Sequence, residues 1–208
     1  KGSALSSFRR FACGGAAVPA DLVHSANGRL ANPCAYRVFG SSEVPMATQG
    51  ILPETSLHKA AETDGKAIDY ELRIVDDEGR DVTTGVDGEV LARGPAMFLG
   101  YADAAQTAES ITEDGYFRTG DIGHLTPEGA LVITGRKKDL IIRGGENISA
   151  KEIEDVLHTH PAVRETAVVA MPHPRLGEGI CAFIIPKDAS RPNIADITAF
   201  VSDAGLAK

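Results

Sequence analysis

Three charged side chains lie in short glycine-containing segments, where they could take part in binding or catalysis. Glu43 ends a Phe-Gly-Ser-Ser-Glu segment, and Asp121 and Arg136 each follow a Thr-Gly pair. An ionised carboxylate accepts hydrogen bonds only and is a hard ligand for a cation such as Mg²⁺. An arginine is a permanent cation with several donors, which suits oxygen-rich ligands. The plainer alternatives are a carboxylate that caps a turn and a solvated arginine beside two lysines.

Two glycine pairs are a second feature that could serve a ligand. Gly14-Gly15, followed by Ala16, ends one expected strand, and Gly144-Gly145 follows another. Glycines at such positions let the backbone come close to a bound molecule. A tight turn or a β-bulge also explains either pair on local grounds, so neither pair decides the function alone.

The histidines and cysteines indicate neither a metal centre nor a disulfide framework. His158 and His160 are two residues apart at the end of an expected helix and so face different directions, and no Cys or carboxylate completes a ligand set with His173. The three cysteines are widely spaced, which fits a reducing compartment. The start of the chain has no apolar signal segment, so we expect a cytoplasmic location.

The composition excludes several classes of partner. The chain has 208 residues, 43% of them hydrophobic, and a net charge of −8, which opposes non-specific binding to nucleic acid or anionic lipid. No apolar run approaches the roughly 20 residues that a transmembrane helix needs. We therefore expect no nucleic-acid partner and no transmembrane segment, while homo-oligomer formation stays open.

The apolar pattern predicts an α/β fold in which βαβ layers and an antiparallel sheet or small barrel precede a small α+β lobe. Two expected hairpin turns, Asp77-Glu78-Gly79 and Asp87-Gly88, interrupt the alternation of residues 70–93. Ser149 and Glu152 form an expected capping box. We place the domain boundary after residue 137. The expected elements are strands near 8–13, 35–39, 116–120, 140–143, 166–170 and 180–186, and helices near 19–30, 103–111, 149–158 and 194–204.

Five motifs in a fixed order carry a resemblance. They are Gly14-Gly15-Ala16-Ala17, residues 39–43, residues 88–95 with Gly100-Tyr101, residues 115–121, and residues 135–148. From about Arg10 to its end the chain resembles the adenylate-forming superfamily of acyl-CoA synthetases, peptide-synthetase adenylation domains and firefly-type luciferases. The resemblance implies that residues 1–137 are the C-terminal part of the large adenylate-binding domain and that residues 138–208 are a truncated, small, mobile C-terminal domain.

The implied activity is an ATP-dependent carboxylic acid:CoA ligase that works through an acyl-adenylate. Its ligands would be ATP or AMP, Mg²⁺, coenzyme A as co-substrate, and a small carboxylic acid. By the resemblance, Gly15 and Ala16 form one wall of the adenine site and Ile133 covers the other face of the ring. Asp121 accepts the ribose hydroxyls, and Arg136 contacts ribose or phosphate.

The remaining implied roles concern the metal, the hinge and the thiol. Glu43 would hold Mg²⁺ against the phosphates, and Glu43, Arg136 and Lys138 are the implied catalytic residues. Lys138 matches the hinge position of the family, and the Gly144-Gly145 pair would line the channel for the pantetheine arm. The other implied ligand contacts are Ser42, which stands where the family usually carries Thr, and Phe39, which stands where Tyr is common and keeps an aromatic wall.

Two parts that the resemblance implies do not occur in these 208 residues. They are a Ser/Thr/Gly-rich phosphate loop ending in Lys and a late Pro-Lys-Thr-x-x-x-Gly-Lys segment with a catalytic lysine. We therefore expect an incomplete portion of an enzyme, poorly active or inactive in isolation.

Other functions stay open on the sequence. One is a non-catalytic, adenine-nucleotide-binding regulatory module. Another is a peptide-synthetase adenylation domain, although its loop usually reads Tyr-Gly-Pro-Thr-Glu. The segment from Ile142 to Ile148 is closest to medium-chain and aromatic or alicyclic acyl-CoA ligases, without identifying the acid.

Overall fold

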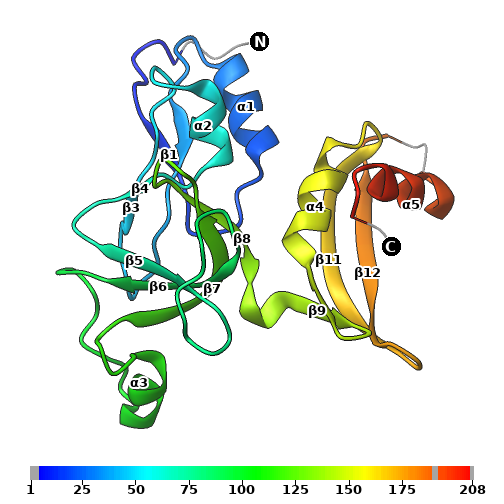
Figure 1. The fold of residues 1–208 in the computed structure, drawn as a ribbon. Coiled ribbons are helices and arrows are strands. Elements are labelled where there is room, and N and C mark those ends of the chain that lie inside the picture. The colour runs from blue at the N-terminus through cyan, green and yellow to red at the C-terminus, as the bar shows by residue number, and fades with distance from the viewer. Residues whose placement is uncertain (1–4, 189–191, 207–208) are drawn as a thin grey trace. The chain divides into compact units, whose positions relative to one another are not determined.

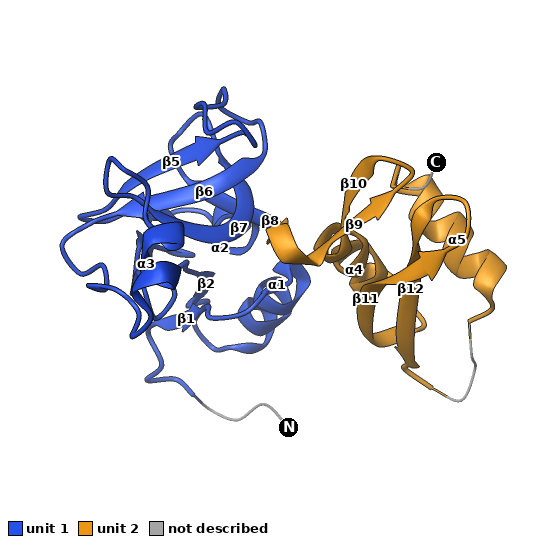
Figure 2. Cartoon of the chain, turned by 90° about the horizontal axis from the view of Figure 1, so that it is seen from below, with its two compact units in different colours: residues 1–134 blue, residues 135–208 orange. Residues whose placement is uncertain are grey.

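The computed structural model describes residues 5–188 and 192–206, which form two compact units. The first unit comprises residues 1–134 and the second residues 135–208 (Figure 2). The division falls within strand β8 (Leu131–Arg136), a few residues before the boundary expected from the sequence. Within the described part of the chain, no helix is long and apolar enough to cross a bilayer.

The first unit begins with a strand, a helix and a second strand (Figure 1). These are β1 (Phe11–Cys13), α1 (Ala20–Arg29) and β2 (Ala35–Arg37). The two strands pair in parallel, with Phe11 opposite Ala35 and Cys13 opposite Arg37. The predicted strand, helix, strand order is confirmed, with shorter elements than the sequence indicated.

One buried amide joins helix α1 to strand β2. The Asn27 side chain donates to the Ala35 carbonyl at 2.9 Å and accepts from the amides of Cys34 and Ala35 at 2.9 and 2.8 Å. These hydrogen bonds connect the C-terminal half of α1 to the start of β2. Val23, Ala35 and Ala61 form the small apolar core beneath it.

The first unit also contains a four-stranded antiparallel sheet in the order β5-β6-β7-β8. Its strands are β5 (Glu71–Val75), β6 (Gly88–Arg93), β7 (Phe117–Leu125) and β8 (Leu131–Arg136). The unit also contains β3 (Thr48–Gln49), paired with β4 (Lys66–Ala67), and the helices α2 (Leu57–Glu62) and α3 (Ala104–Ser110). The main core comprises Phe39, Val44, Ala47, Tyr70, Ile74, Val90, Ala92, Phe117 and Leu131.

One of the two expected hairpin turns is correct and the other is wrong. The turn at Asp77-Glu78-Gly79 is confirmed, because the Gly79 amide donates to the Asp76 carbonyl at 3.0 Å. Asp87-Gly88 is no turn: Gly88 is the first residue of β6, and a Cβ there would collide with the Val75 carbonyl. Close approach of two strands, rather than chain reversal, requires this glycine.

The second unit is the expected α+β lobe. A 3₁₀ turn (Lys137–Asp139) leads into β9 (Leu140–Arg143), and the sheet order is β10-β9-β12-β11. The Ser149 hydroxyl accepts from the Glu152 amide at 3.3 Å, which confirms the predicted helix start. Ile141, Ile153, Leu157 and Val168 form the core. The other elements are β10 (Glu146–Ser149), α4 (Ala150–Thr159), β11 (Val163–His173), β12 (Gly177–Pro186) and α5 (Ile194–Asp203).

We expect Asn27→Ala to lower the free energy of unfolding by about 3 kcal/mol, because it leaves buried amides and a carbonyl without their partner. Urea denaturation followed by circular dichroism measures the change. Asn32→Ala is the matched control, since Asn32 is exposed and its side chain donates to the exposed Ser6 carbonyl. We expect that control to change the stability by about 0.5 kcal/mol or less. Equal effects of the two substitutions would contradict the role given to Asn27.

Candidate functional site

The carboxyl ends of β1 and β2 lie side by side and carry two of the predicted segments. The Val38 amide donates to the Cys13 carbonyl at 2.9 Å, so both chains leave the parallel pair at the same edge. A Cβ on Gly14 would lie 2.7 Å from the Val38 carbonyl oxygen, so this glycine permits the close approach. Gly15 and Ala16 are exposed beyond it, and Gly15 has a φ of +79°. Ligands of α/β proteins bind at such strand ends.

Two hydrogen bonds to Thr48 hold the start of the segment that follows β2. The Phe39 amide donates to the Thr48 hydroxyl at 2.8 Å, and the Thr48 amide donates to the Phe39 carbonyl at 3.1 Å. A Cβ on Gly40 would lie 2.6 Å from the Met46 nitrogen, which explains the glycine. The Phe39 side chain is buried in the main core, whereas Ser42 is exposed. The predicted aromatic wall is therefore largely a core residue.

The Glu43 carboxylate is oriented by two hydroxyl groups. Tyr101 donates to Oε1 at 2.9 Å and Ser41 donates to Oε2 at 2.8 Å. The amide of Phe98 also donates to the Glu43 carbonyl at 2.8 Å. Burial, and then the hydrogen bond to Glu43, raises the pKa of Tyr101, so its phenol remains a donor at neutral pH. An oriented carboxylate, completed by phosphate oxygens and waters, is a donor set that Mg²⁺ accepts.

Aromatic packing holds Tyr101 in this position. Its ring meets that of Phe98 edge-on at 4.8 Å between centroids, and Phe98 meets Phe117 of β7 at 5.2 Å. The Tyr101 amide donates to the Thr107 hydroxyl of α3 at 2.8 Å. Gly100-Tyr101 is one of the sequence motifs, yet the sequence alone assigns no role to the tyrosine; in the structure its hydroxyl orients Glu43.

Asp121 lies on an irregular stretch of β7. Glu89 pairs with Ile122 while Leu91 pairs with Arg118, so Val90 alone faces the bulge formed by residues 119–121. The Thr119 hydroxyl donates to the Val90 carbonyl at 2.7 Å and accepts from the Asp121 amide at 3.1 Å. Gly120 has a φ of +70°, which suits glycine. Bulges of this kind redirect side chains near functional sites, and here Asp121 is buried.

Ile133 lies on β8, next to the strand that carries Asp121. Its amide donates to Oδ2 of Asp64 at 2.8 Å, and its side chain packs against the main core, which includes Phe39. The Thr134 hydroxyl donates to the Ile122 carbonyl at 3.4 Å, which joins β8 to β7 next to Asp121. The first unit therefore connects Ile133 both to Asp121 and to the segment that leads to Glu43.

The other predicted residues lie in the second unit (Figure 2). Arg136 is exposed at the end of β8, and Lys138 is exposed in the 3₁₀ turn. Gly144 and Gly145 form the turn between β9 and β10, where Arg143 pairs with Glu146.

Backbone conformation is enough to explain the Gly144-Gly145 pair. The two residues have φ values of +63° and +91°. A two-residue hairpin with positive φ at both positions strongly favours glycine. A Cβ on Gly145 would meet no atom within 4 Å, so crowding does not require this glycine. The predicted channel for a pantetheine arm stays a prediction.

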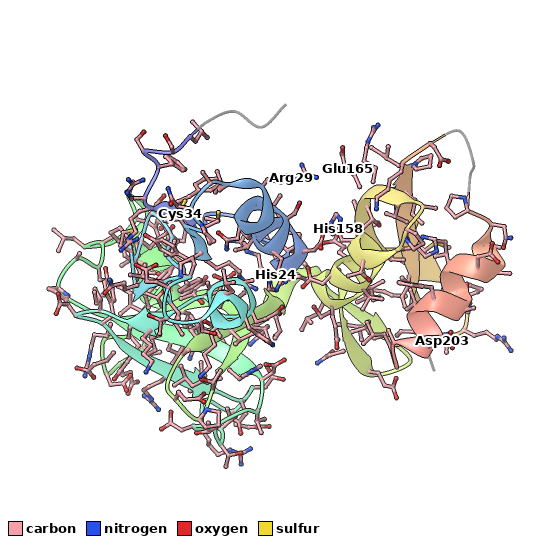
Figure 3. All side chains as sticks on the ribbon, turned by 90° about the horizontal axis from the view of Figure 1, so that it is seen from above. His24, Arg29, Cys34, His158, Glu165 and Asp203 are labelled. Carbon is pink, nitrogen blue, oxygen red and sulfur yellow. The ribbon has the colours of Figure 1, made fainter. Side chains whose placement is uncertain are left out.

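The histidines and cysteines of the described residues form no centre of their own. No group of three His, Cys, Asp or Glu side chains there could hold a metal ion. His24 projects from α1 and His158 from α4 (Figure 3), and His24 pairs with Glu62 of α2 at 3.1 Å. Cys13, Cys34 and Cys181 are free thiols.

Comparison with known proteins assigns the chain to a family. Residues 1–102 match the family described as AMP-binding enzyme, and residues 152–206 match the AMP-binding enzyme C-terminal domain. The chain belongs to this family of adenylate-forming enzymes, which confirms the resemblance drawn from the motifs.

Individual relatives show how the chain compares with longer proteins. It is 38% identical to the medium-chain fatty-acid–CoA ligase of Escherichia coli (strain K12), over 98% of this chain and 36% of that protein. It is 44% identical to the 2,3-dihydroxybenzoate-AMP ligase of Bacillus subtilis (strain 168), over 82% of this chain and 32% of that protein. The structure of the amide bond synthetase McbA from Marinactinospora thermotolerans matches with a TM-score of 0.87 and 33% identity, over 96% of this chain and 40% of McbA. The chain thus spans about a third of the length of these curated relatives.

If Glu43 holds Mg²⁺, the hydrogen bond from Tyr101 to Glu43 should affect the Mg²⁺ dependence of the full-length protein. Tyr101→Phe keeps the ring packing and removes one donor from the carboxylate. Loss of a hydrogen bond that orients a metal ligand typically weakens metal affinity about 10- to 100-fold. We expect the Mg²⁺ concentration for half-maximal pyrophosphate release to rise about tenfold, with a nearly unchanged melting temperature.

Leu99→Ala is the control for this substitution, because Leu99 is fully exposed in the same segment. It should leave the Mg²⁺ dependence unchanged. A Tyr101→Phe protein with the Mg²⁺ dependence of the unsubstituted protein would show that Tyr101 does not orient a metal ligand.

Proposed function

We propose that the full-length protein activates a carboxylic acid as its acyl-adenylate and transfers the acyl group to coenzyme A. The observation that carries this proposal is the Glu43 carboxylate, oriented by Tyr101 and Ser41 in the segment that follows β2. The exposed backbone of Gly15 and Ala16 ends the neighbouring parallel strand. A carboxylate able to hold a phosphate-bound metal, in the segment that leaves one strand of the parallel pair, and an open backbone surface at the end of the other strand together suit an adenine nucleotide.

The chemistry of the proposed reaction follows from the weakness of a carboxylate as an acyl donor. Its leaving group would be oxide, so a carboxylate oxygen first attacks the α-phosphorus of ATP, and the bond to pyrophosphate breaks. The CoA sulfur then attacks the carbonyl carbon of the mixed anhydride, the bond to AMP breaks, and the thiol proton passes to solvent. Both steps depend on positioning and charge neutralisation more than on covalent participation of the protein.

The nucleoside contacts that we propose come from the first unit. The backbone at Gly15 and Ala16 packs on one face of the adenine, and the Ile133 side chain covers the other. Asp121 accepts the two ribose hydroxyls, because an ionised carboxylate offers acceptors and no donor. The position of Asp121 on a bulge supports this role, because bulges redirect side chains next to functional sites. The positive φ of Gly120 belongs to this bulge and not to a regular strand.

The remaining proposed roles concern phosphates, metal and acyl transfer. Mg²⁺, when bound, would neutralise phosphate charge, and Glu43 is the residue of this chain that we propose to hold it. Ser42, exposed next to Glu43, would donate to a phosphate oxygen. For Arg136 we propose ribose or phosphate contact, for Lys138 a hinge, and for the Gly144-Gly145 pair passage of the pantetheine arm. These last three roles rest on the sequence motifs of the family.

The acid that we propose is a medium-chain fatty acid or an aromatic acid. The names of two relatives support this choice: one is a medium-chain fatty-acid–CoA ligase and the other a 2,3-dihydroxybenzoate-AMP ligase. The small residues of the segment after β2 fit either class. Coenzyme A as the acceptor is supported by the first relative, while McbA is named as an amide bond synthetase, so the acceptor needs a direct test.

The test is pyrophosphate release by the full-length protein with ATP, Mg²⁺ and a panel of fatty and aromatic acids, with and without CoA. We expect acid-dependent pyrophosphate release, and AMP release that needs CoA. AMP release that needs an amine in place of CoA would overturn the choice of acceptor alone. AMP binding without acid-dependent pyrophosphate release would favour a regulatory module over an enzyme.

Asp121→Asn tests the proposed ribose contact. The substitution replaces a group that only accepts hydrogen bonds by one that also donates them. We expect the dissociation constant for AMP to rise about 10- to 100-fold, because a charge-assisted hydrogen bond is lost. Isothermal titration calorimetry measures the constant. Asp103→Asn, at the exposed N-cap of α3, is the control. An unchanged dissociation constant for Asp121→Asn would remove this residue from the site.

A further inference from the structure

A buried ion pair in the first unit has no place in the roles proposed so far. Nε of Arg37 donates to Oδ1 of Asp64 at 2.9 Å, and Nη2 donates to Oδ2 at 2.6 Å. The two side chains are only 5% and 9% exposed. The third guanidinium nitrogen, Nη1, donates to the carbonyl of Ala61 in α2 at 3.1 Å. The pair is bidentate, shielded from solvent and tied to a helix.

Asp64 also binds the strand that carries Ile133. Its Oδ2 accepts from the Ile133 amide at 2.8 Å, and its own amide donates to the Leu131 carbonyl at 2.7 Å. The next residue continues the contact, since the carbonyl of Gly65 accepts from the Leu131 amide at 2.7 Å. One residue on a short connection thereby fixes β8 through both its side chain and its backbone.

The other side of Asp64 binds the segment that leads to Glu43. The Asp64 carbonyl accepts a hydrogen bond from the Thr48 hydroxyl. The same hydroxyl accepts from the Phe39 amide at 2.8 Å. Arg37 ends β2, two residues before Phe39. Asp64 is therefore hydrogen-bonded on one side to Ile133 and on the other, directly or through Thr48, to the residues that begin the Phe39–Glu43 segment.

We propose that the Arg37–Asp64 pair is a positioning device that holds β8, which carries Ile133, at a fixed distance from the end of β2. Because β2 pairs with β1, which leads to Gly15 and Ala16, the ion pair thereby sets the width of the adenine slot between Ile133 and these two residues. This inference rests on the proposed function, because it takes Ile133 as the cover of the adenine ring. General experience favours positioning over stability, since apolar residues of similar volume commonly replace a buried ion pair without loss of stability. An apolar pair could fill the volume, but it could not accept the Ile133 amide hydrogen.

The test compares two variants of the full-length protein. Asp64→Asn keeps the shape of the side chain but replaces one accepting oxygen by an NH2 group. That group can only donate, as the Arg37 guanidinium and the Ile133 amide already do. Arg37→Met/Asp64→Leu fills the site with apolar side chains and removes the acceptor. We expect the dissociation constant for AMP to rise about tenfold in both variants, which corresponds to about 1.4 kcal/mol. The melting temperature of the double variant should stay near that of the unsubstituted protein, because removal of two buried charges offsets the cost of leaving the Ile133 amide and the Ala61 carbonyl without these partners.

Amide hydrogen exchange supplies a readout that does not depend on nucleotide. In both variants the Ile133 amide should exchange faster relative to the Leu131 amide, which keeps its partner in the Gly65 carbonyl. Leu91→Ala is the control for stability, since Leu91 is buried in the separate cluster of Val75, Leu91 and Tyr116. It should lower the melting temperature without changing the dissociation constant for AMP.

The outcomes separate this inference from the proposed function. Wild-type affinity for AMP in both variants would overturn the positioning role while leaving the nucleotide site intact. Failure of the unsubstituted protein to bind AMP would overturn the proposed function and this inference together. If Asp64→Asn does not fold, because it leaves the Arg37 charge buried without a counter-charge, the double variant decides the matter alone, by its dissociation constant and by the exchange of the Ile133 amide.

Discussion

The first unit depends on how the buried carboxylate of Asp64 is satisfied. An ionised group away from water is costly, by several kcal/mol, unless hydrogen bonds and an opposite charge replace its hydration. Here Arg37 supplies the charge and two donors, and the Ile133 amide supplies another. Because these partners come from strands that are distant in sequence, satisfying one carboxylate constrains the relative position of β2 and β8. Gly65 completes the arrangement, since a Cβ there would collide with the Gln49 carbonyl.

Local patterns were sufficient to predict most of the regular elements. The helix that begins after Ser149 has a capping residue and an apolar face, both of which can be read within a few residues. The short elements β3, β4, α2 and β10 are absent from the sequence prediction, because segments of two to six residues show no period. Asp87-Gly88 misled for another reason. It has the sequence of a turn, but the close approach of the Val75 carbonyl, which depends on a pairing register that the sequence pattern does not reveal, requires the glycine.

The site could be predicted only in part for a similar reason. Glu43 and Asp121 occur in motifs and Ile133 lies two residues before one, so their positions along the chain could be predicted, although their roles remain proposals. Their partners could not be found in this way, since Tyr101 and Glu43 are 58 residues apart and Asp64 and Ile133 are 69 apart. A weak signal was present: Arg37 is a charged residue in a short strand that is otherwise uncharged and mostly buried. A charge in such a strand indicates a buried partner, but not which one.

The glycines show what a motif can and cannot support. Gly14 and Gly40 are required because a side chain would meet neighbouring backbone, whereas Gly144 and Gly145 are required by a positive φ in a two-residue turn. Both kinds look the same in the sequence. Only the first kind, at Gly14, leaves an exposed backbone beside it at the end of a parallel strand. The Gly14-Gly15 pair therefore supports a nucleotide site better than the Gly144-Gly145 pair supports a thiol channel, although the two pairs look alike in the sequence.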